Sequence, residues 1–209
     1  MTAPPTPKAP DRTPVTTPAT SVNASRAAPG LIEGACLHDT KRGEVTAMVI
    51  TLPRRYADRL TATARDLVAL TANVPPVQLR RRPADRGAWS AAMVMSHLAD
   101  AELVYGMRLR LILTEARPLL AAFDQNAWAE RFGGLDDPRD ALNRWRVLRD
   151  ANLRLLASVD DDEWDRTGVH VQRGEMTVAD VAGHLVDHDR IHLDQIRRTL
   201  AEVGRLPLS

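Results

Sequence analysis

Four long segments in which apolar residues recur every three or four positions constrain this chain more than any other feature. The segments span residues 52–72, 91–116, 138–156 and 178–203. This spacing is the period of one face of an α-helix. In the first segment that face is made by Tyr56, Leu60, Ala64, Leu67 and Leu70. Because no segment of comparable strength alternates as a strand would, we predict an all-α four-helix bundle.

The residues at the ends of three segments have the chemistry of helix caps. Ser90 can cap the second helix, which Pro118 stops. Asp137 can cap the third helix, with Pro138 at its first position. The stretch Thr177–Asp180 has the form of a capping box at the start of the fourth helix. The apolar period and the caps therefore predict the same helix boundaries.

The connections between the predicted helices contain proline and glycine. Three prolines prevent a continuous helix across residues 73–86, which we predict to be a loop. Residues 164–175 contain two glycines and a weak alternation of apolar residues, which predicts a loop or a short hairpin.

The first 47 residues differ from the rest of the chain in composition. They hold seven of the 14 prolines, set among threonine, alanine and serine. Such a segment cannot bury enough apolar surface to offset the entropy lost on ordering. We therefore expect a disordered tail at residues 1–47 and one folded domain at residues 48–209. A start codon assigned too far upstream of Met48 would also produce this kind of leader.

Charge and composition exclude several classes of function. Lysine and arginine number 28 against 27 aspartate and glutamate, so the chain lacks the positive field that attracts nucleic acid or an anionic membrane. No apolar run approaches the roughly 20 residues of a spanning helix. The lone cysteine, Cys36, permits neither a disulfide framework nor a thiolate cluster. We expect a cytoplasmic protein whose partners are neither nucleic acid nor membrane.

Three histidines follow one another at spacings of four residues in the last predicted helix. Because each such step turns the helix by about 40°, His184, His188 and His192 lie on one side of it. His188 and His192 project within or beside the apolar face, whereas His184 lies at its edge. His97 lies on the apolar face of the second helix. The imidazoles of His97, His188 and His192 can converge on one metal ion and leave positions open, as in catalytic zinc sites.

A metal is not the only way to accommodate these imidazoles. A buried imidazole needs partners for its ring nitrogens, and hydrogen bonds in a packed core would also supply them. Gln195 could orient a ligand imidazole or a bound water, or make a polar contact at the end of the bundle. Asp100 could accept from the free ring nitrogen of His97 or take up a proton near the metal. We place His184 beside the ligands, at the rim of the site.

Other polar residues in these segments are expected to face solvent. His38 and His170 are predicted to be exposed. Glu102, Asp187 and Asp189 are predicted to be charges on solvated helix faces, because charged residues are rarely buried unless they are paired.

Two stretches of the sequence resemble the DinB family. One is Trp89-Ser90 followed by His97-Leu98-Ala99-Asp100, and the other is the run from His184 to Ile196, HLVDHDRIHLDQI. The similarity covers about residues 50–203. It implies a four-helix bundle of the DinB/YfiT type, usually dimeric, with a histidine triad that corresponds here to His97, His188 and His192. The resemblance alone therefore predicts a homodimer and strengthens the prediction of a metal site.

The same resemblance bears on function. The superfamily includes S-transferases that use bacillithiol or mycothiol, a mycothiol-dependent maleylpyruvate isomerase, and proteins described as metal-dependent hydrolases. We expect an S-transferase that joins a low-molecular-weight thiol to a small electrophile. It is expected to use a divalent transition metal, with zinc and nickel as the first candidates. There are three alternatives: a metal-dependent hydrolase, a non-catalytic metal-binding stress protein, and a purely structural bundle in which the histidines pack in the core without a metal. No residue of the motif identifies a substrate.

Overall fold

The computed structural model of the protein describes residues 52–85 and 87–205, with the side chains described from residue 55 onward. The tail predicted at residues 1–47 lies outside the described residues, and so does His38. Within the described ranges, no helix is both long enough and apolar enough to span a membrane.

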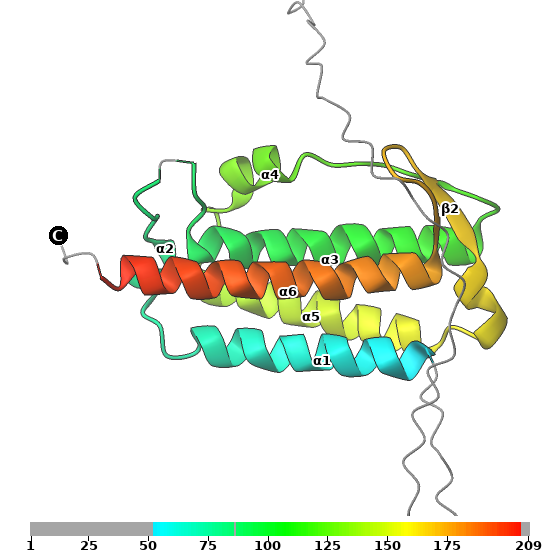
Figure 1. Cartoon of the computed structure of the whole chain (residues 1–209), viewed down its shortest axis with the longest axis horizontal. Coiled ribbons are helices and arrows are strands. Elements are labelled where there is room, and N and C mark those ends of the chain that lie inside the picture. The colour runs from blue at the N-terminus through cyan, green and yellow to red at the C-terminus, as the bar shows by residue number, and fades with distance from the viewer. Residues whose placement is uncertain (1–51, 86, 206–209) are drawn as a thin grey trace, which may run out of the picture. The chain divides into compact units, whose positions relative to one another are not determined.

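Four long helices form the body of the domain, as predicted. They are α1 (Leu52–Thr71), α3 (Ala91–Thr114), α5 (Pro138–Ala157) and α6 (Val178–Val203), and they lie side by side in Figure 1. Helix α3 packs against α5 and α6, and α1 packs against the same two helices. The prediction of a four-helix bundle is confirmed.

The caps hold the helix starts where the sequence placed them. The hydroxyl of Ser90 accepts from a backbone N–H one turn into α3, and Asp137 does the same at α5, where Pro138 is the first helical residue. Thr177 and Asp180 form the predicted capping box, in which each side chain accepts from the other residue's backbone N–H. Each cap satisfies N–H groups that have no partner within the helix.

The connections are more structured than the sequence indicated. The predicted loop at 73–86 contains a one-turn helix, α2 (Pro76–Arg80), because proline is well suited to a first helical position. Between α3 and α5 the chain forms strand β1 (Leu119–Leu120) and helix α4 (Gln125–Phe132), neither of which was predicted. A 3₁₀ helix, η1 (Asp161–Asp165), follows α5.

The predicted short hairpin is present next to the start of α6. Strands β2 (Thr167–His170) and β3 (Gly174–Thr177) pair antiparallel, and β1 adds to β2 in parallel. Gly174 has a φ of 77°, a conformation that a residue with a Cβ rarely adopts. This small sheet covers one end of the bundle, as Figure 1 shows beside β2.

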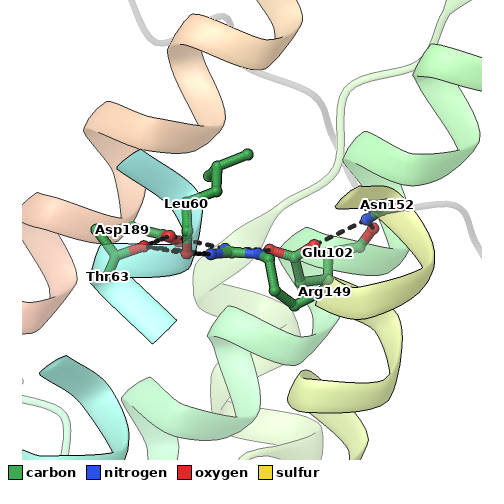
Figure 2. Close-up of polar contacts among 6 residues, drawn as sticks. All are labelled: Leu60, Thr63, Glu102, Arg149, Asn152 and Asp189. Atoms are coloured by element: carbon green, nitrogen blue, oxygen red, sulfur yellow. Dashed lines mark hydrogen bonds and ion pairs between the residues drawn. The ribbon is translucent and has the colours of Figure 1, made fainter. Parts of the chain in front are cut away.

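A buried charge network crosses the bundle between its helices. Arg149 of α5 is 2% exposed, and its guanidinium contacts Glu102 of α3 and, at 2.7 Å, Asp189 of α6. Thr63 of α1 donates to Asp189 at 2.6 Å, and Asn152 of α5 donates to Glu102 at 2.8 Å. Figure 2 shows the guanidinium between the two carboxylates. All four long helices therefore contribute to one polar cluster.

This network corrects one sequence-based expectation. Glu102 and Asp189 were predicted to be solvated charges, but they are 1% and 2% exposed. Their partner, Arg149, lies on a different helix, so the burial of the carboxylates depends on the packing of three helices. Asp187 does remain exposed, as predicted.

Candidate metal centre

The bundle brings together the three histidines selected from the sequence. His97 projects from α3, and His188 and His192 project from successive turns of α6. Nε2 of His97 lies 3.0 Å from Nε2 of His188 and 3.2 Å from Nε2 of His192. One ligand atom from each residue lies within 4.8 Å of the other two. The three imidazole nitrogens therefore point at one small volume.

These distances fit the dimensions of a metal site. At a metal–nitrogen distance of about 2.1 Å, nitrogens lie about 3.4 Å apart around a tetrahedral ion and about 3.0 Å apart around an octahedral one. The spacings of 3.0 and 3.2 Å fall at and between those two values. Three neutral imidazoles form a donor set suited to zinc, nickel, copper or iron. The residues present fit a single divalent transition metal with further positions open.

Burial keeps the imidazoles in the neutral form that a metal needs. Burial and then the neighbouring His192 lower the pKa of His97 to about 3. Burial, followed by the other two imidazoles and Arg149, lowers the pKa of His188 to about 2. Burial also lowers the pKa of His192, although its hydrogen bond with Gln195 acts in the opposite direction. A lone pair is therefore available on each ring at neutral pH.

Gln195 lies where the sequence suggested it could orient a ligand. Its Oε1 is 2.7 Å from Nδ1 of His192. An amide oxygen only accepts, so Nδ1 carries the proton and Nε2 presents its lone pair toward the other histidines. The Nδ1 atoms of His97 and His188 are buried, and no residue of the described chain forms a hydrogen bond with them.

Asp100 does not accept from His97, although the sequence suggested that it could. Asp100 pairs with Arg144, 3.6 Å away, instead of accepting from His97. Three residues along a helix correspond to a rotation of about 60° from the starting direction, enough to direct the carboxylate past the imidazole. His184 lies one turn before His188 and approaches Arg173 of the hairpin, 3.5 Å away. It belongs to the surroundings of the site rather than to its ligands.

Aromatic rings shield one side of the triad. Trp89, just before α3, stacks on His192 at a centroid distance of 6.2 Å and meets His97 edge-on at 5.1 Å. Phe123, in the segment before α4, lies 6.5 Å from His97. These apolar surfaces limit access of water and lower the local dielectric around the imidazoles.

Two cavities adjoin the triad from different directions. The larger, of about 510 Å³, includes His188 in its lining, together with Tyr105, Arg108, Phe123 and Arg173. The smaller, of about 290 Å³, includes His192, Gln195 and Trp89. Gln125, the first residue of α4, lines both cavities. Two of the three histidines thus each line a different cavity.

Several residues of these cavities were not found from the sequence. Arg108 lies on α3 eleven residues beyond His97, where its position alone predicts a solvated charge. His170 was expected to be exposed, but it is 4% exposed because β2 places it against Arg108, 3.0 Å away. The weak alternation around Gly168 was the one available signal, since period two alternates side chains between the two faces of a strand.

Comparison with known proteins identifies the family to which this bundle and triad belong. The model of the DinB superfamily matches residues 59–196, which include every residue of the triad. The chain belongs to the DinB superfamily. Described relatives of this DinB protein come from bacteria.

Two relatives of known sequence illustrate the similarity. A protein of Oceanobacillus iheyensis, whose name proposes a metal-dependent hydrolase, is 30% identical over 118 residues, which are 55% of this chain and 66% of the relative. YfiT of Bacillus subtilis, named in the same way, is 28% identical over 120 residues, 56% of this chain and 67% of the relative. The chain thus spans just under two thirds of the O. iheyensis relative.

Two solved structures share the fold. YfiT of B. subtilis, described as having an unusual four-helix bundle topology, matches with a TM-score of 0.67 at 24% identity and covers 79% of this chain and 94% of its own. A mycothiol-dependent maleylpyruvate isomerase matches with a TM-score of 0.58 at 12% identity, over 71% of this chain and 68% of its own. At these identities the likeness concerns the fold.

Proposed function

We propose that this DinB protein is a metal-dependent enzyme that transfers a low-molecular-weight thiol to a small electrophile. The observation that carries the proposal is the position of the triad beside two cavities: His188 lines one of about 510 Å³, and His192 lines another of about 290 Å³. A transferase must hold two organic molecules at one reactive centre, and a cavity beside each of two ligand histidines provides room for both. The isomerase that shares the fold is named as mycothiol-dependent, which agrees with a thiol partner.

The residues of the site have separate tasks in this proposal. The triad would hold a divalent ion, with zinc and nickel as the first candidates. When bound, such an ion lowers the pKa of a thiol or water beside it. Gln195 keeps His192 in the tautomer that presents Nε2. Trp89 and Phe123 limit access of water to the reacting atoms. In the transfer, the thiolate sulfur bonds to the electrophilic carbon, the leaving group takes the bonding electron pair, and the thiol proton passes to solvent.

A hydrolase is the second candidate, because the relatives carry names that propose metal-dependent hydrolysis. The same residues would then act on a water molecule and one organic substrate. A third possibility is a non-catalytic role in which an ion ties α3 to α6 and contributes mainly to stability.

The first experiment measures bound metal in protein purified without an affinity tag. We expect about one equivalent per chain in the wild type and His184→Ala, and a loss of most of it in His188→Ala. His184 is the matched control, because it lies one turn away on the same helix without contacting the triad. Equal metal content in the wild type and in His188→Ala would contradict the site.

The second experiment separates transfer from hydrolysis. The metal-loaded protein is incubated with an electrophile such as a chlorodinitrobenzene, with and without an added thiol, and the products are identified by mass spectrometry. A thioether that forms only with thiol and only in the metal-loaded protein supports transfer. A hydrolysed product without thiol supports the second candidate, and absence of any turnover in metal-loaded protein with a range of thiols and electrophiles supports the third.

A further inference from the structure

Arg108 is a buried cation beside the metal centre. The residue is 6% exposed and lines the larger cavity. One terminal nitrogen, Nη2, donates to the carbonyl of Ala121 at 2.7 Å and lies 3.0 Å from Nε2 of His170. Its Nε is buried without a hydrogen-bond partner, and no carboxylate forms an ion pair with it in residues 55–85 and 87–205. The guanidinium also lies over the ring of Tyr105, 5.3 Å from its centroid, but no anion balances its charge within these described residues, and a buried charge is costly unless it is paired.

The contacts of His170 also indicate that this cavity has more hydrogen-bond donors than acceptors. The backbone N–H of Gln172 points at Nδ1 of His170, at 3.2 Å, while Arg108 points at Nε2. A neutral imidazole has one N–H and one acceptor nitrogen. A donor therefore faces each ring nitrogen, but only the unprotonated nitrogen can accept. The protonated nitrogen points its N–H at another donor, and neither of these two donors has an acceptor there. Burial, together with Arg108 and Arg173, lowers the pKa of His170, and protonation would in any case turn both ring nitrogens into donors.

The lining of the cavity has a positive balance. Arg173, exposed at the hairpin, contributes a second guanidinium, and it contacts His184 rather than an acid. The carboxylate in the lining is Asp124, whose Oδ1 already accepts from two backbone N–H groups at the start of α4. Two arginines against one aspartate leave a formal net charge of about +1 in the lining of the cavity.

We propose that Arg108 and Arg173 form an anion subsite in the larger cavity, and that the molecule bound there is a small organic carboxylate. A carboxylate offers two coplanar acceptors that match the fork of a guanidinium. In the metal-free protein its single negative charge equals the formal net charge of the lining, whereas a phosphate dianion exceeds it. The rings of Tyr105 and Phe123 in the same lining suit the carbon skeleton of an organic acid rather than an inorganic ion.

This subsite deepens the proposed function, and it rests on that function only for the statement that the bound acid is a reactant. His188 lines the same cavity, so an acid held by the arginines lies in a cavity that adjoins the metal centre. The arginines would thereby select, among thiols or electrophiles, those that carry a carboxylate. Binding of the acid itself requires no turnover and can be measured on metal-free protein.

The test compares benzoate with benzamide, a neutral molecule of nearly the same shape, by isothermal titration calorimetry. We expect benzoate to bind the metal-free wild type at least about tenfold more tightly than benzamide, the range for a hydrogen bond to a charged group. Arg108→Met should lower the affinity for benzoate by about tenfold or more. Arg173→Gln, an exposed change that does not threaten folding, should weaken it by about threefold. Arg154→Gln removes a charge from an exposed pair on α5 and should leave benzoate binding unchanged.

Three outcomes would overturn the proposal. Equal binding of benzamide would show an apolar pocket without an anion subsite. Benzoate binding that requires added zinc and persists in Arg173→Gln would show a carboxylate bound to the metal instead. Inorganic phosphate that binds more tightly than benzoate, with the same dependence on the arginines, would assign the subsite to phosphate. Failure of thiol transfer with intact, arginine-dependent benzoate binding would contradict the proposed function and leave the subsite in place.

Discussion

Replacing Arg149 by methionine is expected to destabilise the metal-free domain by about 3–5 kcal/mol, the usual cost of removing one partner from a buried ion pair. Arg149 is 2% exposed and contacts both Glu102 and Asp189. Methionine has a similar volume, so the change removes charge with little change in packing. Two carboxylates would then remain buried without a cation.

The stability lost in Arg149→Met should be larger at neutral pH than at acidic pH. Burial raises the pKa of Glu102 and of Asp189, and Arg149 opposes that effect in both. Without Arg149 both folded-state pKa values rise further above those of the unfolded chain, so at neutral pH the unfolded state ionises more readily. The destabilisation is therefore largest at pH 7–8 and shrinks as the pH falls toward about 4, the unfolded pKa of these carboxyls.

Urea unfolding in the presence of a chelator measures this prediction directly. For a domain of this size, 3–5 kcal/mol corresponds to a fall in melting temperature of about 6–20 °C. The matched control is Arg154→Met, on the same helix, whose exposed pair with Asp150 should contribute about 0.5 kcal/mol or less. If the two variants lie within about 1 kcal/mol of each other at pH 7.5, the buried network does not hold the helices together.

Three further predictions use other contacts. A Cβ at Gly106 would lie 2.3 Å from Oδ1 of Asn152, so Gly106→Ala should cost about 1–3 kcal/mol in urea unfolding. Gly134→Ala, where a Cβ meets nothing within 4 Å, should be nearly neutral. Gln195→Ala should weaken zinc binding by about 10–100-fold in competition with a chromophoric chelator, because it removes the acceptor that orients a ligand. An unchanged affinity would exclude that role. The metal-free protein should lose stability as the pH falls below about 6.5, the unfolded pKa of histidine, because the pKa of His97 is lowered to about 3 in the folded state and the unfolded chain takes up the proton. Between pH 7.5 and 5.5, the metal-free His97→Leu variant should lose less stability than the metal-free wild type.

Local features of the sequence were sufficient to predict the four long helices and to select the three histidines. The apolar period and the caps at Ser90, Asp137 and Thr177 depend on neighbours within one turn, so one stretch of chain contains the needed information. The same holds for His188 and His192, because a spacing of four places two side chains on one helix face whatever the helix packs against. Sequence spacing therefore predicted the pair, and the apolar face of its helix indicated His97.

Contacts between helices were decided by the tertiary structure alone. Glu102 and Asp189 have the spacing of solvated charges, and only the packing of α5 against α3 and α6 brings Arg149 between them. Asp100 and His170 were misplaced for the same reason, since their partners are Arg144 of α5 and Arg108 of α3. A helix period gives the direction of a side chain from its own axis. Whether that direction ends in solvent, at an ion pair or in a cavity depends on where the next helix lies, which is set by the packing of the whole core.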